Sequence, residues 1–234
     1  MDVRLLTVWL AVAAGCASES GKDTAGDAAL GSDSIRARPS SPTATTHDGR
    51  PVALLVGTSL TAGMGLDPDD AYPALLQRKA DSAGLAIRIV GAGLSGETSA
   101  GALRRVDWLL AEPPQFVLIE TGANDGLRGL NVDSTRANLR AILRRVKAAA
   151  PGAIVLLAQM ESPPNFGAAY TSRFREMFPT VAREEGAVLV PFLLDGVAGV
   201  PSMNQSDGIH PNEEGSRLVA ENLWRTLEPV FRRN

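Results

Sequence analysis

Five short apolar runs, all after residue 50, constrain the fold of this chain more than any other feature. Most of them are almost continuously apolar rather than alternating, which is typical of strands that are covered on both faces. Helical patterns separate them, so we expect a parallel sheet with helices on both sides, an α/β protein of three layers. The runs are Pro51–Val56, Ile87–Val90, Phe116–Ile119, Ile154–Ala158 and Val188–Phe192.

The predicted helices between these runs carry apolar side chains at i, i+3, i+4 and i+7 spacing. We expect Pro179 to kink or divide the third of them, because proline lacks the backbone N–H. The last helix should begin near Glu213. The four apolar stripes are Leu103, Val106 and Leu110; Leu139, Ile142, Leu143 and Val146; Tyr170, Phe174, Phe178 and Val181; and Val219, Leu223 and Leu227.

The first residues have the composition of an export signal. Leu5 to Ala14 is an apolar run behind one basic side chain, Arg4, and small residues follow it. The run is too short to span a bilayer, which needs roughly 20 residues. The stretch from Val12 to Cys16 resembles the lipobox of bacterial lipoproteins, whose cysteine is lipid-modified. That resemblance implies an exported, periplasmic or outer-surface protein of a bacterium, anchored in the membrane through Cys16; an ordinary cleaved signal is the alternative.

The chain therefore divides into three predicted parts. Residues 1–16 form the signal peptide with its lipobox-like cysteine. Residues 17–50 are rich in Ser, Gly, Ala, Asp, Thr and Pro, with few large apolar residues to offset the entropy of ordering, and we expect a disordered linker. Residues 51–234 are enough for one folded domain.

Composition excludes several classes of function. The net charge is −3 and the basic residues are scattered, which argues against a nucleic-acid-binding surface. The single cysteine allows no internal disulfide. One histidine in the domain and no cysteine cluster leave few metal ligands, so we expect no metal.

The segment from Asp207 to Asn212 holds the only histidine of the predicted domain, His210. Imidazole is the side chain suited to general-base work near neutral pH. Asp207 lies three residues upstream, close enough on a tight turn to orient the ring. The same segment also suits a plain helix start, since Asn212 is a good N-cap.

Other polar segments follow the first three predicted strands. Ser59 lies at a Gly-rich turn and could be a nucleophile or an N-cap. Gly96 would let its backbone N–H approach a ligand closely, and Asn124 could donate a side-chain N–H. Because the carboxyl ends of parallel strands meet at one edge, we expect all these segments to converge there. Three neutral donors, Ser59 N–H, Gly96 N–H and the Asn124 amide, would then form an oxyanion hole.

Four segments, in order and at plausible spacing, resemble the consensus blocks of the SGNH, or GDSL, hydrolase superfamily. They are Gly57-Thr58-Ser59-Leu60, Gly91 to Thr98, Gly122-Ala123-Asn124-Asp125 and Asp207 to Pro211. Within the superfamily, the chain looks most like the bacterial thioesterase I/lysophospholipase and arylesterase branch, over about Pro51 to Phe231.

The resemblance implies a flavodoxin-like five-stranded sheet and a serine esterase that needs no cofactor. It implies a triad of Ser59, Asp207 and His210, and an oxyanion hole of Ser59, Gly96 and Asn124. The substrates would be small carboxylic esters or thioesters, lipid-derived ones included. The family usually has Asp before the serine, where this chain has Thr58. We expect Thr58 to cap the turn through its hydroxyl, with a changed hydrogen bond rather than lost activity.

Three other functions compete with this interpretation. One is an acetyl esterase acting on carbohydrate, and another is a non-catalytic lipoprotein that binds lipid in the same cleft. The third is a dinucleotide-binding module, because Gly91 to Gly96 satisfies G-x-G-x-x-G and Glu120 lies about where a ribose-binding acid would sit. That third function leaves Ser59, Asn124 and the Asp207–His210 pair without a role.

The apolar residues of the loops after the strands are candidates to border the cleft and accept an acyl chain. The alternative is that some of them simply pack the domain. They are Met64, Leu66, Leu94, Leu127, Met160 and Phe166.

Overall fold

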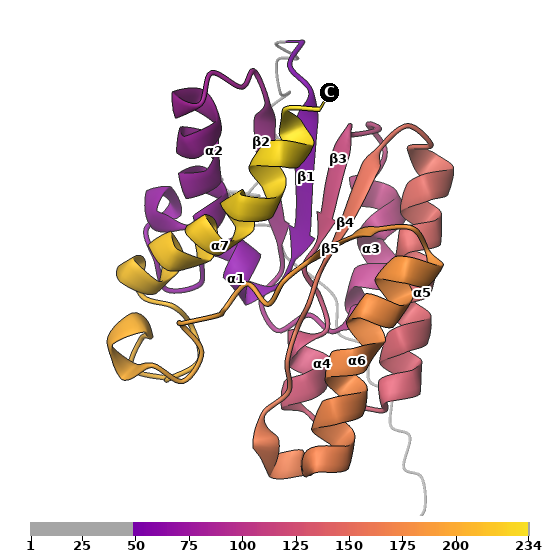
Figure 1. Ribbon diagram of the computed structural model, residues 1–234, viewed down its shortest axis with the longest axis vertical. Helices are drawn as coiled ribbons and strands as arrows, with labels where there is room; N and C mark the ends of the chain where they lie inside the picture. The colour runs from indigo at the N-terminus through magenta and orange to yellow at the C-terminus, as the bar shows by residue number, and fades with distance from the viewer. Residues whose placement is uncertain (1–48, 234) are drawn as a thin grey trace, which may run out of the picture. The chain divides into compact units, whose positions relative to one another are not determined.

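The computed structural model describes residues 49–233 (Figure 1). Predictions for the signal peptide, Cys16 and the linker up to residue 48 lie outside the described residues. The sheet has the strand order β2-β1-β3-β4-β5 and every pairing is parallel, which confirms the flavodoxin-like prediction. The strands are β1 (Val52–Gly57), β2 (Arg88–Gly93), β3 (Phe116–Ile119), β4 (Ile154–Ala158) and β5 (Val188–Val190).

Helices cover both faces of the sheet (Figure 1). On one face, α2 (Tyr72–Ser82) packs against α7 (Glu213–Phe231). On the other, α5 (Val132–Ala149) lies between α3 (Ser99–Leu109) and α6 (Ala168–Glu184). The shorter helices are α1 (Ser59–Ala62), α4 (Ala123–Leu127) and the 3-10 turns η1 (Pro68–Asp70), η2 (Pro164–Phe166) and η3 (Pro201–Met203).

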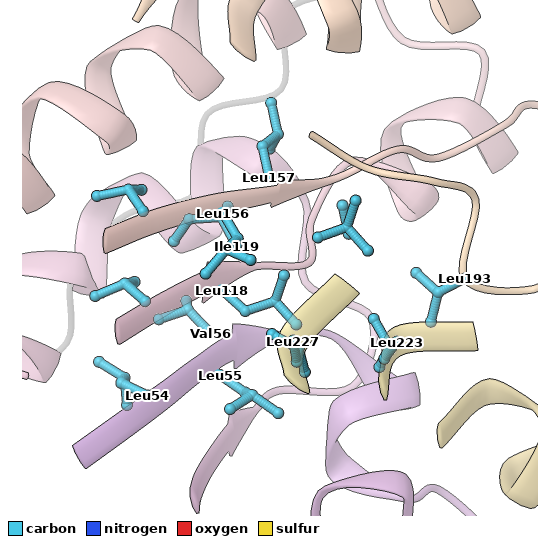
Figure 2. Close-up of a cluster of buried hydrophobic side chains, with 14 of the residues drawn as sticks. Leu54, Leu55, Val56, Leu118, Ile119, Leu156, Leu157, Leu193, Leu223 and Leu227 are labelled. Atoms are coloured by element: carbon cyan, nitrogen blue, oxygen red, sulfur yellow. The ribbon is translucent and has the colours of Figure 1, made fainter. Parts of the chain in front are cut away.

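The hydrophobic core lies between the central strands and the helix layers. β3 is wholly buried, and β1 and β4 are buried except at their first residues. Figure 2 shows leucines of these strands close to Leu223 and Leu227 of α7. The prediction of strands covered on both faces is confirmed for these three. It is wrong for β2 and β5, which are only partly buried because each forms an edge of the sheet.

Of the two expected effects of Pro179, a kink or a division, the division is wrong, because helix α6 continues through this residue. A proline inside a helix costs about 3 kcal/mol. Buried side chains on both sides of it, among them Phe174, Met177 and Val181, hold the helix against the sheet. Tertiary packing therefore outweighs the local penalty.

The strand register places the segments after β1, β2 and β3 at the same edge of the sheet. Gly57 pairs with Gly93, and Val56 pairs with Ile119. The order changes direction between β1 and β3, and ligands of such folds bind at that switch point. None of the helices within residues 49–233 is long and apolar enough to cross a membrane.

Candidate active site

Ser59, His210 and Asp207 form a continuous chain of hydrogen bonds. Ser59 Oγ lies 2.9 Å from His210 Nε2, and His210 Nδ1 lies 2.6 Å from Asp207 Oδ2. Ser59 and His210 are 151 residues apart in the sequence, so the fold alone brings them together. The predicted convergence of these three residues is present in the structure.

The loop that carries His210 is held by local bonds. Asp207 Oδ1 accepts hydrogen bonds from the backbone N–H groups of Ile209 and His210, at 2.9 and 3.0 Å. The bonds from the His210 side chain and from both N–H groups hold the pKa of Asp207 well below its usual range. Asp207 is therefore a carboxylate at any pH at which an imidazole base works. Asn212 caps α7 by accepting from Gly215 N–H at 3.0 Å, so this segment is both a helix start and part of the site.

Gln205 links the histidine loop to the segment after α1. Its Nε2 donates to Met64 O at 2.7 Å and to Pro211 O at 2.9 Å, and its backbone N–H donates to His210 O at 2.8 Å. The distance between the serine and histidine segments is fixed in part by this side chain, which the sequence patterns did not single out.

Ser59 is the first residue of α1 and is only 8% exposed. Its backbone N–H has no acceptor within the helix, as for any first-turn residue. The expectation that Thr58 caps the turn is wrong, because its side chain makes no capping bond. The Thr58 hydroxyl donates instead to Glu120, at 3.0 Å to Oε1, since the buried carboxylate there requires donors.

Glu120 follows β3 and is completely buried beneath the serine turn. It accepts hydrogen bonds from Thr58 and Thr61. Burial raises its pKa to about 7, partly offset by these bonds. Burial and the neighbouring Glu120 also raise the pKa of Tyr72, whose hydroxyl contacts Thr61. A side chain enclosed in this way cannot reach a ribose, which removes the acidic residue that a dinucleotide site would need.

Two of the three oxyanion candidates, Asn124 and Gly96, lie on segments that are bonded to each other. Asn124 Nδ2 donates to Glu97 O at 2.9 Å, which joins the segment after β3 to the one after β2. An amide nitrogen carries two hydrogens, so a second donor is left for a ligand. Gly96 is exposed and has φ +76°, a backbone conformation that favours glycine. Arg128 Nη2 donates to Gly96 O at 3.0 Å and ties the segment after α4 to this turn.

A partly buried ion pair supports the same edge of the sheet. Arg105 Nη2 lies 2.7 Å from Glu97 Oε2 and also donates to the carbonyls of Gly57 and Ala92, at 3.1 and 2.9 Å. One guanidinium therefore fixes the ends of β1 and β2 and the loop that contains Gly96.

A further polar cluster surrounds Asp125, the residue that follows Asn124 in the chain. Asp125 is buried and accepts from Ser99 N–H at 2.8 Å, Ser99 Oγ at 2.6 Å and Thr135 Oγ1 at 3.1 Å. These bonds join α4 to α3 and α5.

The sequence contained a signal for the supporting acidic residues, since Glu120 and Asp125 are charged residues beside apolar runs. Their partners are 59 to 62 and 10 to 26 residues away, which no local pattern indicates.

Most of the apolar candidates lie on the surface around this edge. Met64, Leu94, Leu127 and Phe166 are each at least 39% exposed. Leu66 and Met64 line a narrow cavity of about 10 Å³ with Ser59 and His210, room for about one water. Met160 follows the alternative that some of these residues pack the domain, because its side chain is 1% exposed and belongs to the core.

Two charged clusters of the site, Glu97–Arg105 and Asp207–His210, contain too few ligands for a metal. Among residues 49–233, no group of three or more His, Cys, Asp or Glu side chains could hold a metal ion. The donors around Ser59 are neutral groups instead.

Comparison with known proteins agrees with this arrangement. The model of the GDSL-like Lipase/Acylhydrolase family matches residues 55–218. The chain is 45% identical over 179 residues to Esterase TesA of Pseudomonas aeruginosa, covering 76% of this chain and 88% of the relative. It is 39% identical over 178 residues to Thioesterase 1/protease 1/lysophospholipase L1 of Escherichia coli (strain K12), covering 76% and 83%.

A solved structure has the same fold. The psychrotrophic esterase EstA from Pseudoalteromonas sp., in a form inhibited by monoethylphosphonate, superimposes with a TM-score of 0.74 at 36% identity, covering 78% of this chain and 99% of that one. The match to the family model spans all four of the segments singled out in the sequence. The chain therefore belongs to the GDSL-like lipase/acylhydrolase family and is an ester-hydrolysing enzyme, as its sequence predicted.

Proposed function

We propose that this chain hydrolyses carboxylic esters through an acyl-serine intermediate, with Ser59 as nucleophile, His210 as general base and Asp207 as the acid of the triad. The observation that carries the proposal is the unbroken chain of bonds from Ser59 Oγ through the imidazole to Asp207, at 2.9 and 2.6 Å. A base within hydrogen-bond reach of the nucleophile, itself oriented by a third group, is the arrangement that activates a serine.

In the first half of the reaction, Ser59 Oγ attacks the ester carbonyl as its proton moves to His210 Nε2. Asp207 accepts the Nδ1 hydrogen bond and stabilises the imidazolium that forms. The tetrahedral intermediate collapses when the ester oxygen leaves with the proton from Nε2. Ser59 is then acylated and the alcohol departs.

In the second half, a water molecule loses a proton to His210 Nε2 and attacks the acyl-serine. The second tetrahedral intermediate expels Ser59 Oγ, which recovers its proton from the ring, and the carboxylic acid leaves. In both halves the oxyanion is stabilised by Ser59 N–H, Gly96 N–H and the Asn124 amide, donors that cost no reorganisation during the reaction.

The test is hydrolysis of p-nitrophenyl acetate by the Ser59→Ala variant. We expect kcat to fall by at least about 10³-fold, because the variant has no hydroxyl to acylate. Ser172→Ala is the matched control, since Ser172 is an exposed residue of α6 whose hydroxyl bonds Glu176 at 2.7 Å. Full activity in Ser59→Ala, with a melting temperature equal to that of the wild type, would contradict the proposal.

We propose that the acyl group of the substrate lies on exposed apolar side chains of the segments that follow β3 and β4, including Leu127 and Phe166, which are 43% and 39% exposed. A panel of acyl esters of increasing chain length, with alcohol, phenol and thiol leaving groups, measures the preference. Leu127→Ser and Phe166→Ser should lower kcat/KM for long acyl chains more than for acetate. Trp108→Ser is the control, because Trp108 is 75% exposed near the other end of α3. An equal loss for all chain lengths would contradict this part.

We also propose that the protein is exported and anchored through a lipid on Cys16. The support is the sequence alone: an apolar run followed by small residues and the single cysteine. In a bacterial host, wild-type protein should sediment with membranes and Cys16→Ser should be released to the soluble exported fraction. Wild-type protein found only in the soluble fraction would contradict the anchor.

A further inference from the structure

The carboxylate of Glu120 lies directly beneath the nucleophile turn. Its Oε2 accepts from Thr58 N–H at 2.8 Å and from Thr61 Oγ1 at 2.8 Å, and its Oε1 accepts from Thr58 Oγ1 at 3.0 Å. Thr58 immediately precedes Ser59 and Thr61 follows it by two residues. The serine is therefore held from both sides by a single side chain.

The backbone of β1 is shaped to admit this carboxylate. A Cβ on Gly57 would lie 1.8 Å from Thr61 Oγ1 and 2.5 Å from Glu120 Oε2. Only glycine fits at this position unless the cluster moves. The cluster of Glu120, Thr58 and Thr61 thus occupies space that any other residue at position 57 would fill.

Burial of the Glu120 carboxylate also costs free energy, and the need to maintain the fold does not by itself explain this cost. Burying a carboxylate destabilises the charged form unless a cation accompanies it. In the part of the chain that the structure describes, Glu97 is paired with the partly buried Arg105, whereas the partners of Glu120 are hydroxyl and amide donors. A buried charge with neutral donors is typical of a functional site.

We propose that Glu120 is a positioning residue for the nucleophile: by accepting hydrogen bonds from Thr58 and Thr61, it fixes the turn that holds Ser59 Oγ against His210. This inference rests on the proposed role of Ser59. Glu120 does not touch the reacting atoms, and it acts through the geometry of the Ser59 turn.

The proposal has a consequence for pH. When Glu120 takes up a proton, one of its oxygens becomes a donor that a threonine hydroxyl can accept, and the other oxygen can still accept from Thr58 N–H. Tyr72 of α2 faces the same cluster through Thr61 and stays protonated, because burial raises its pKa well above the usual value. Arg105 of α3 binds Gly57 O on the adjacent strand end and is paired with Glu97. His210 lies across Ser59 from Glu120. Protonation of Glu120 should therefore leave the turn in place, so that the imidazole of His210 alone sets the acid side of the activity profile.

Two variants separate position from charge. Glu120→Leu removes all acceptors and leaves Thr58 N–H without a partner. Glu120→Gln keeps an oxygen for Thr58 N–H and can donate its amide to a threonine hydroxyl, which can also accept. We expect Glu120→Leu to lose about 10²-fold in kcat, the effect of a misplacement of about 1 Å, with KM nearly unchanged. Glu120→Gln should keep kcat within about threefold of the wild type at pH 8.

The fall of kcat at nearly constant KM in Glu120→Leu and its rescue by the conservative Glu120→Gln are the readouts that a merely structural role would not give. Because a protonated Glu120 keeps the same bonds as Gln, log(kcat/KM) of the wild type and of Glu120→Gln should both rise with a slope of about 1 on the acid side, set by the imidazole. Glu221→Gln is the control, since Glu221 is an exposed residue of α7 with a half-exposed side chain and should keep the wild-type profile.

The experiment measures kcat, KM and the pH profile of these variants and of Ser59→Ala with p-nitrophenyl acetate. Full kcat in Glu120→Leu would overturn the inference. A Gln variant as inactive as the Leu variant would also overturn it, because charge rather than position would then matter. If Glu120→Leu does not fold, the kcat of Glu120→Gln decides alone. Full activity in Ser59→Ala would instead overturn the proposed function.

Discussion

The two halves of the site are built in different ways. The histidine half is a surface loop in which Asp207 orients His210 from three residues away, and the Asp207 side chain is 42% exposed. The serine half is a buried turn whose support, Glu120, comes from another strand 62 residues further along the chain. The bonds that position the histidine half are made within one loop, whereas those that position the serine half are made between strands of the sheet. Substitutions in the two halves should therefore fail in different ways.

The largest effect is expected in the histidine half, from His210→Ala. General-base catalysis contributes up to about 10⁴-fold, so kcat should fall by about that factor. The melting temperature should stay close to the wild-type value, because the ring bonds only Ser59 and Asp207 through its side chain. The control is His47→Ala, which replaces the only other histidine. A loss of less than tenfold, at any pH from about 5 to 8, would mean that another group acts as base.

Asp207→Asn should come next, with a loss of about 10³-fold in kcat, because an amide can stabilise neither the correct tautomer nor the imidazolium. The bonds from His210 and Ile209 hold the pKa of Asp207 well below its usual range, so the carboxylate stays charged as pH falls toward mild acid. The rise of wild-type activity with pH should therefore come from other groups. Asp195→Asn, an exposed aspartate, should be neutral. Equal activity of the two variants would contradict an orienting role for Asp207.

Asn124→Ala tests the segment between the two halves. Loss of one oxyanion donor costs about 10²–10³ in kcat, and we expect the lower end because the serine and glycine N–H groups remain. Asn131→Ala is the matched control. Asn131 caps α5 by accepting from Asp133 and Ser134 N–H groups, so its loss should cost about 1 kcal/mol of stability and leave kcat unchanged. An unchanged kcat in Asn124→Ala together with a reduced kcat in Asn131→Ala would contradict the oxyanion role of Asn124.

The smallest effect belongs to the serine half and concerns stability. The folded protein raises the pKa of Glu120 from 4.5 to about 7. A raised carboxyl pKa means that the folded state binds the proton more tightly than the unfolded state, so stability is fully present below about pH 4.5 and falls as pH rises through about 7. The loss should be of the order of 3 kcal/mol.

Denaturant unfolding at several pH values checks this expectation. Glu120→Gln cannot titrate, so its stability should exceed that of the wild type by an amount that grows between pH 5 and 8, about 3 kcal/mol at most. A difference independent of pH would mean that Glu120 keeps its ordinary pKa in the folded protein.

The difference between the halves also explains what could be read from the sequence. The strands and the last helix follow from apolar periodicity, and their order along the sheet follows from the family resemblance. Asp207 and His210 are three residues apart, so their partnership is visible in the chain. Ser59, Gly96 and Asn124 were found because each directly follows a strand, and parallel strands end at one edge.

What the sequence did not predict depends on contacts across the sheet. Glu120 was considered only as a ribose-binding acid, whereas it lies beneath Ser59. Thr58 was expected to cap the turn, and its hydroxyl bonds Glu120 instead. Met160 was expected near the cleft and is in the core. In each case the contacts of the residue depend on the direction in which its side chain points beyond the end of a strand. The pattern of apolar residues in the sequence indicates that direction only within the strand itself.

The central claim, that His210 activates Ser59 as the nucleophile, is tested most directly by reaction with an alkylphosphonate ester followed by peptide mass spectrometry. The account predicts one covalent adduct, located on Ser59, that forms in step with loss of esterase activity. The adduct should be absent in Ser59→Ala and should form at least about 10²-fold more slowly in His210→Ala. Inactivation with the adduct on another residue, or equally rapid labelling of Ser59 without His210, would contradict the account.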